Sequence, residues 1–152
     1  MLATFDEVMT ALLGDSGVVH EGLSESQARE LGVERYMNSP AKKVRIVRDW
    51  VWLDIQAPQS EATALEQGGF MPAILYAHAV VHDFSNDFDA GNWVCSTVLV
   101  KGSSPSALVE TKNSFYILVG KGYRRTVRPQ VIVSIIHGAG ILCELRCSEA
   151  GA

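Results

Sequence analysis

Residues 43–55 read KVRIVRDWVWLDI, and this stretch decides the fold class. Its side chains are mainly β-branched or aromatic, which are the types that favour strands. The sequence therefore predicts a long strand over Lys43–Ile55 and a second one over Ala73–Asp83. Shorter strands are predicted at residues 93–100, 107–111, 115–119, 131–136 and 141–145, with a hairpin turn at residues 112–114.

Helices are predicted mainly ahead of these strands. Thr4 and Glu7 form a capping-box pattern, after which apolar residues recur at helical spacing. Ser24 opens a second helix in the same way, and Gly32 is expected to end it. A short third helix is predicted over residues 60–67.

This order of elements, helices first and then strands with short connections, predicts an α+β fold. The N-terminal helices are expected to pack on a mainly antiparallel, twisted sheet or partly open barrel, rather than to alternate with parallel strands. The length of 152 residues suits one domain, with a helical part at 1–39 and a strand-rich part at 43–147. The helical part is acidic, because it carries seven acidic and two basic side chains.

Composition excludes several classes of protein. Hydrophobic residues make up 47% of the chain and charged residues 20%, as in ordinary globular proteins. No apolar run approaches the length of about 18–20 residues that spans a membrane, and no signal-peptide pattern is present, so a cytoplasmic location is expected. A net charge of −4 argues against a general nucleic-acid binder. The three cysteines, Cys95, Cys143 and Cys147, are an odd number and are interpreted as free thiols.

The spacing of the candidate metal ligands argues against a shared metal ion. His78 and His82 are four residues apart, which on a strand separates them by about 13 Å, too far to share one metal ion. Cys143 and Cys147 have the same spacing. The acidic segment at residues 83–91 lacks the glycine and glutamate positions of a calcium loop and is interpreted as a solvated turn. No metal, cofactor or catalytic residue is therefore predicted.

A basic cluster is the most specific candidate for binding. Lys121, Arg124, Arg125 and Arg128 place four positive charges within eight residues, with Tyr123 among them and no acidic residue between. Such a cluster can bind an anion, such as a phosphate group, or an acidic protein surface. Basic residues on an edge strand also oppose aggregation, so a structural role stays open.

Other side chains of the predicted strands leave two alternatives open. Trp50 and Trp52 alternate along a strand and so face the same side. They either anchor an interface, where tryptophan is enriched, or pack in the core. The strand face bearing His78, His82 and Glu110 is the alternative place for a ligand site, because these side chains are polar on an otherwise apolar sheet.

The second half of the chain contains a set of distinctive segments: Tyr76-Ala77, Asp83, FDAGNWV at residues 88–94, Ser96-Thr97, ETKNSFYILVG at residues 110–120, Gly122 and Arg124-Arg125. In these segments the chain resembles an uncharacterised family of small bacterial and bacteriophage proteins. The resemblance implies no established activity. It does imply an accessory role, because phage accessory proteins of this size often bind and block a host factor such as a defence system.

Two functions are compatible with these observations. The first is a protein-binding accessory or inhibitor that uses a sheet edge, the basic segment 121–128 or an exposed tryptophan. The second is a small ligand-binding protein or enzyme with a site around His78, His82 and Glu110. A homo-oligomer formed through an exposed edge strand is compatible with either function.

Overall fold

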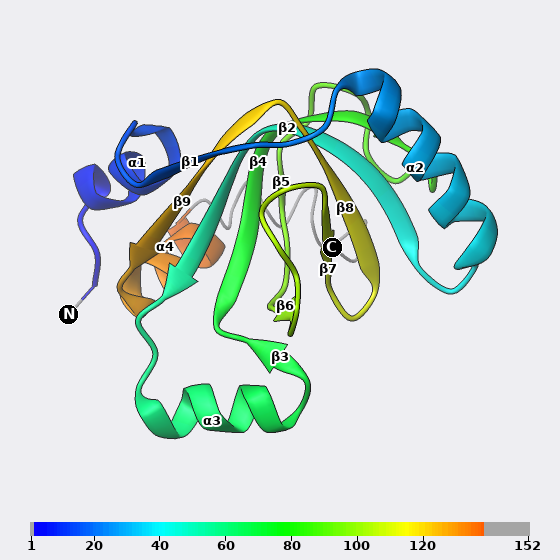
Figure 1. Cartoon of the computed structure of the whole chain (residues 1–152). Coiled ribbons are helices and arrows are strands. Elements are labelled where there is room, and N and C mark those ends of the chain that lie inside the picture. Colours follow the sequence, from blue (N-terminus) through cyan, green and yellow to red (C-terminus); the bar gives the residue numbers. More distant parts are fainter. Residues whose placement is uncertain (1, 139–152) are drawn as a thin grey trace.

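Strand β2 (Lys43–Ile55) lies in the middle of the main sheet of the computed structural model, which describes residues 2–138 (Figure 1). β4 (Ala73–Asp83) pairs antiparallel with β2 over most of its length. On the other side of β2, β8 (Ser114–Val119) runs parallel to its first half and β9 (Lys121–Val127) runs parallel to its second half. The two predicted long strands are confirmed, and they are neighbours.

Shorter strands complete the sheet. β1 (Val18–Glu21) pairs with β9, β5 (Val94–Cys95) with β4, and β7 (Leu108–Glu110) with β8, each in antiparallel orientation. A separate two-stranded sheet joins β3 (Phe70–Met71) and β6 (Leu99–Val100). Within residues 2–138, most strand pairs are antiparallel and the main sheet does not close into a barrel, so the predicted α+β class is confirmed.

The described residues include four helices, α1 (Phe5–Leu13), α2 (Glu25–Asn38), α3 (Gln59–Gln67) and α4 (Pro129–Gly138). In Figure 1, α1 and α2 lie near opposite ends of the sheet, and α3 projects beyond it. Buried side chains of α1 and α4 form one apolar cluster with the second half of β2. Ala28 of α2 packs in another cluster with the first half. Helices from both ends of the described chain therefore cover one face of the sheet.

Helix α1 begins as predicted, with one difference. The Thr4 hydroxyl accepts a hydrogen bond from the Glu7 backbone N–H at 3.1 Å. The Glu7 carboxylate does not fold back to complete the capping box, because it binds the guanidinium of Arg128. Glu7, which the sequence pattern assigns to the cap of α1, therefore connects α1 to the segment that follows β9.

Helix α2 differs from the prediction at its C-terminal end. Ser24 and Gln27 form the predicted capping box. Gly32 does not end the helix, which continues to Asn38. The glycine instead lies against the ring of Phe84, and a Cβ at this position would be 2.5 Å from Phe84 Cε2. The missing side chain therefore lets α2 approach the sheet.

The strand predicted at residues 131–136 is wrong, because these residues form the middle of α4. Pro129 is the first residue of this helix, a position that tolerates its missing N–H and fixed φ. Val131, Ile132 and Ile135 are buried at helical spacing. The β-branched residues that suggested a strand therefore belong to an amphipathic helix.

Two further strand predictions have different outcomes. Residues 93–100 form two separate short strands, β5 and β6, rather than one continuous strand. The strand predicted at residues 141–145 lies outside the described residues, as do Cys143 and Cys147. Within residues 2–138, no helix has the length and apolar character needed to span a membrane.

Both faces of the sheet bury side chains along β2. Trp50 and Trp52 contribute to the core on one face, whereas Val51 and Leu53 lie on the face that α1 and α4 cover. This alternation is interrupted at Asp49, which has a φ of 52° and lies where β8 gives way to β9 as the neighbour of β2. This change in the alternation of β2 determines which side chains of β9 lie on the sheet face that the helices cover.

Candidate functional site

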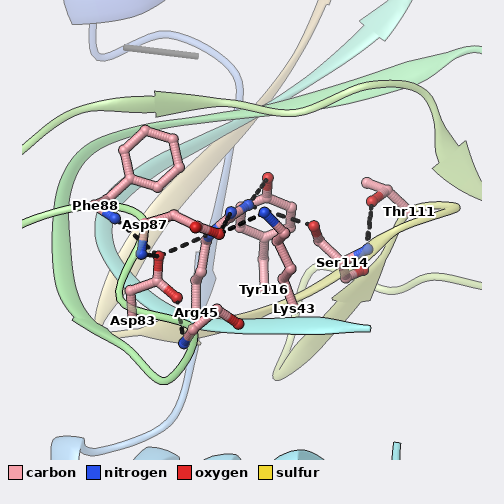
Figure 2. Close-up of polar contacts among 9 residues, drawn as sticks. Lys43, Arg45, Asp83, Asp87, Phe88, Thr111, Ser114 and Tyr116 are labelled. Atoms are coloured by element: carbon pink, nitrogen blue, oxygen red, sulfur yellow. Dashed lines mark hydrogen bonds and ion pairs between the residues drawn. The ribbon is translucent and has the colours of Figure 1, made fainter. Parts of the chain in front are cut away.

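A buried arginine on β2, Arg45, is the centre of a polar cluster inside the protein (Figure 2). Its Nε lies 3.2 Å from Asp83 Oδ2, and its Nη2 lies 3.0 Å from Asp87 Oδ2. Its Nη1 lies 3.3 Å from both Ser114 Oγ and Tyr116 Oη. Together these side chains form the Arg45 cluster, which consists of Lys43, Arg45, Asp83, Asp87, Phe88, Ser114 and Tyr116.

Asp83 shapes the turn that follows β4. Its carboxylate accepts hydrogen bonds from the backbone N–H groups of Ser85, Asp87 and Phe88, at 2.9–3.1 Å. The sequence predicts a solvated acidic turn here, but Asp83 is only 4% exposed. The turn is therefore organised around a buried carboxylate that also neutralises Arg45.

Two aromatic rings enclose the Arg45 guanidinium. Its central carbon lies 4.7 Å from the centre of the Phe88 ring and 5.9 Å from that of Tyr116. Burial opposes the charge of Arg45, but Tyr116 and Asp83 outweigh it, so the pKa of Arg45 lies above its ordinary value. Burial raises the pKa of Tyr116. At neutral pH the cluster therefore contains a charged arginine and a protonated tyrosine.

Lys43 and Asp87 form the solvent-facing side of the cluster, with Lys43 Nζ 2.6 Å from Asp87 Oδ2. Burial opposes the ionisation of Asp87, but Lys43 and then Arg45 outweigh it, so the pKa of Asp87 lies below its ordinary value. Two cations and two anions balance one another. Among the described residues, no group of three His, Cys, Asp or Glu side chains could hold a metal ion. The cluster thus joins β2, β8 and the turn after β4 through ion pairs and hydrogen bonds.

Most of the predicted basic cluster lies on β9, which is a strand between β1 and β2 rather than a loop. Arg124 forms two hydrogen bonds with Asp54, at 2.6 and 3.1 Å. Arg128, just after the strand, forms two with Glu7, both at 2.7 Å. These two guanidinium groups are therefore already compensated by carboxylates of the same chain.

Arg125 and Lys121 have different surroundings. Arg125 is 7% exposed, and its Nη1 and Nη2 donate to the carbonyl oxygens of Thr10 and Gly14. These carbonyls lie at the C-terminal end of α1, where a cation is favourable. Arg125 therefore docks α1 on the sheet. Lys121, in contrast, is exposed, and its Nζ lies 5.5 Å from the centre of the Tyr123 ring, which Arg125 also contacts at 4.9 Å.

Trp50 and Trp52 are both core residues, with exposures of 1% and 0%. Trp50 Nε1 lies 3.2 Å from the carbonyl oxygen of Gly120, and Trp52 Nε1 lies 2.9 Å from Asp54 Oδ1. The Trp50 ring also lies against Gly122. In this fold, neither indole offers a surface to a partner.

The structure gives His78, His82 and Glu110 separate neighbours. His78 Nε2 lies 2.9 Å from a carbonyl oxygen at the end of α1. The His82 ring packs edge-on against Phe84, with 4.5 Å between ring centres. Glu110 forms an ion pair with Lys42. The three side chains that suggested a common ligand site are therefore dispersed.

Sequence reasoning missed β1 and, with it, the edge of the main sheet. β1 pairs with β9 on one side and is the last strand in the order of the sheet within the described residues. Val18 and Val19 are 60% and 52% exposed, and Leu13 at the end of α1 is 66% exposed. The available signal was a pair of β-branched residues between Gly17 and Gly22.

The chain also matches a known protein family. A family described as a domain of unknown function, DUF6957, matches residues 21–134, well over half of the chain. The chain belongs to the DUF6957 family. No curated protein and no solved structure matches it.

The DUF6957 match divides the candidate residues into two groups. It includes the whole Arg45 cluster and all of β9. Helix α1 and the exposed residues Val18 and Val19 precede it. The family relationship therefore covers the sheet with its buried ion pair, whereas the exposed edge and the helix docked by Arg125 lie outside the matched range.

Proposed function

We propose that this DUF6957 protein is a protein-binding accessory that pairs an extended segment of its partner with the free edge of β1. Exposed strand edges carry backbone N–H and C=O groups that can extend the sheet into another chain. The exposed valines Val18 and Val19 are the observation that carries this proposal. They offer apolar contacts on either side of an added strand, because successive side chains point to opposite faces.

Two other binding routes expected from the sequence have less support. Arg124 and Arg128 are paired with carboxylates of the same chain. Trp50 and Trp52 are buried. The edge, in contrast, reads VVHE and has neither the lysine nor the proline that commonly protects an edge strand.

The nature of the partner belongs to the same proposal. We infer a phage-encoded protein that acts in the cytoplasm on a host factor, such as a component of a defence system. This inference is supported by the resemblance to small phage and bacterial proteins and by the composition. The alternative of a ligand site or enzyme around His78, His82 and Glu110 has less support, because these side chains have separate neighbours.

Affinity capture from the lysate of the native host, read by mass spectrometry, tests the proposal. The wild-type protein is compared with a Val18→Lys/Val19→Lys variant, in which two exposed apolar side chains of β1 become charged. The matched control is Val33→Lys/Met37→Lys, which makes the same change at two exposed positions of α2. We expect one partner to be captured by the wild type and the control and lost from the β1 variant.

Three results would reject the edge as the binding site: a partner that the β1 variant retains, a partner that both variants lose equally, or no captured partner together with a wild-type mass equal to that of one chain. Light scattering on the same proteins tests a second copy of the chain as the partner. A doubled mass that falls to that of one chain in the β1 variant alone would identify the partner as a second protomer paired edge to edge.

A further inference from the structure

A cavity of about 350 Å³ lies between the C-terminal end of α1 and the sheet. Leu12 and Leu13 of α1 line it, together with His78 of β4 and with Lys121, Tyr123 and Arg125 of β9. A volume of this size is at the lower end of the range of small-molecule sites. The cavity is distinct from the Arg45 cluster and from the outer edge of β1.

The strand register explains why the three β9 side chains meet there. Tyr123 is paired with Val51, and Arg125 is paired with Leu53. Val51 and Leu53 lie on the face of the sheet that α1 and α4 cover. Because alternate residues of a strand share a face, Lys121 lies on that face as well.

Arg125 differs from the other buried or paired arginines of the sheet. Arg45 and Arg124 each bind a carboxylate, whereas no carboxylate of the described residues lies within ion-pair distance of Arg125. Its Nε has no hydrogen-bond partner among those residues. Burial lowers the pKa of Arg125, and the charge of Asp15, which lies beyond ion-pair distance, only partly offsets this effect. Arg125 therefore lacks a direct ion pair, which an anionic ligand can supply.

The remaining lining defines the chemistry of that ligand. Lys121 adds a second positive charge, and Asp49, the one carboxylate in the lining, has a side chain that is 68% exposed and 4.0 Å from Arg48. The Tyr123 ring, which lies between Lys121 and Arg125 along β9, contacts both cations. Leu12 and Leu13 provide apolar surface on the side of α1.

We propose that this cavity binds a small organic anion, with a carboxylate or phosphate head group beside Arg125 and Lys121 and an apolar body against α1. The head group takes the place of the acidic partner that Arg125 lacks. Charge-assisted hydrogen bonds to such cations are the strong ones in proteins, and the apolar wall favours an organic anion over an inorganic one. The site does not depend on the proposed function, because it makes no use of the exposed side chains of β1.

The test is an NMR titration of the ¹⁵N-labelled full chain with benzoate, phenyl phosphate, inorganic phosphate and neutral benzamide. We expect saturable shifts at the backbone amides of residues 121–125 with benzoate or phenyl phosphate. The stronger of these two identifies the preferred head group. Benzamide, which has the same ring without the charge, is expected to bind at least about tenfold more weakly.

Substitution of the exposed Lys121 avoids unfolding, which is a risk at Arg125 because that residue also docks α1. Lys121→Glu is expected to weaken anion binding about tenfold, while Lys101→Glu, the same change at an exposed loop position, leaves it unchanged. A Val18→Lys variant, which changes β1 opposite Arg124 rather than opposite Tyr123, is expected to bind the anion like the wild type, and this result separates the site from the edge. Equal binding of benzoate and benzamide, equal effects of the two glutamate substitutions, or no saturable binding of either organic anion overturns the proposal.

Discussion

The indole of Trp50 lies against the backbone of Gly122 and leaves no room there for a side chain. A Cβ built on Gly122 would be 2.5 Å from Trp50 Cε3 and still closer to two other atoms of the ring. The indole is 1% exposed, and its Nε1 is held by the carbonyl oxygen of Gly120 at 3.2 Å. Rotation of the ring into solvent would relieve the steric clash, but it would break this hydrogen bond and expose the core.

Gly122→Ala is therefore expected to lower the free energy of unfolding by about 3 kcal/mol, the upper end of ordinary overpacking costs. Urea unfolding followed by tryptophan fluorescence measures this change. Gly68→Ala is the control, because its Cβ would meet its nearest atom at 3.4 Å and its φ is −82°. The control is expected to change stability by less than about 1 kcal/mol. Similar losses for both variants would contradict the steric explanation.

Local sequence signals predicted those elements whose shape is set by neighbours in the chain. The Thr4 and Ser24 caps, the alternation along β2 and the hairpin of β7 with β8 all depend on side chains a few residues apart. The fold class followed from the order of these elements. The buried Arg45 cluster could not be predicted in this way, because its members are distant in the sequence: Arg45 and Tyr116, for example, are 71 positions apart.

The predictions that are wrong depend on distant contacts. Gly32 looks like a helix end, but its role is set by Phe84, which is more than fifty residues away. Residues 131–136 are mostly β-branched, yet they form a helix that is buried beside α1. Pro129, at the first position of this helix, was the available signal. Likewise, nothing local in the sequence reveals that Gly122 accommodates the ring of Trp50.

Gly32→Ala tests the contact between α2 and Phe84. Alanine is favoured over glycine inside a helix by about 1 kcal/mol, but here its Cβ would be 2.5 Å from Phe84 Cε2. We expect a net loss of about 1–2 kcal/mol, since the ring must move. In a Phe84→Leu background the same substitution is expected to be neutral or stabilising, because the ring atoms it meets are gone. A double-mutant cycle in urea without such coupling would show that Gly32 is not retained for Phe84.

Substitutions in the buried pair of Arg45 and Asp83 are expected to differ in their cost to the free energy of unfolding. Asp83→Ala removes the carboxylate from the buried guanidinium and from three backbone N–H groups, so we expect a loss of at least about 3–5 kcal/mol. Arg45→Met is expected to cost less, because those three N–H groups still stabilise Asp83. Arg124→Met, which breaks a partly exposed pair with Asp54, is the control and should cost about 1 kcal/mol or less. A reversed order in chemical unfolding would contradict this account of the cluster.

The ionisation of Asp87 is expected to affect how the free energy of unfolding changes in acid. Burial opposes its ionisation, but Lys43 and Arg45 outweigh it and hold the pKa of Asp87 below its ordinary value of 3.8 in the folded protein. The unfolded chain therefore binds a proton at higher pH than the folded chain does. The stabilising contribution of Asp87 is fully present above about pH 4 and is lost as the pH falls through the folded pKa.

Asp87→Asn is accordingly expected to lower stability at pH 7 and to reduce the loss of stability on acidification below about pH 4. Urea unfolding of the wild type and the variant at a series of pH values from 7 to about 2.5 measures both effects. Asp89→Asn, at an exposed position of the same segment, is the matched control for the removal of one acidic group. If the two variants had the same pH dependence, the ion pairs of Asp87 would not stabilise the fold. If Asp87→Asn were more acid-sensitive than the wild type, the folded state would oppose the carboxylate of Asp87, and the inferred direction of its pKa shift would be wrong.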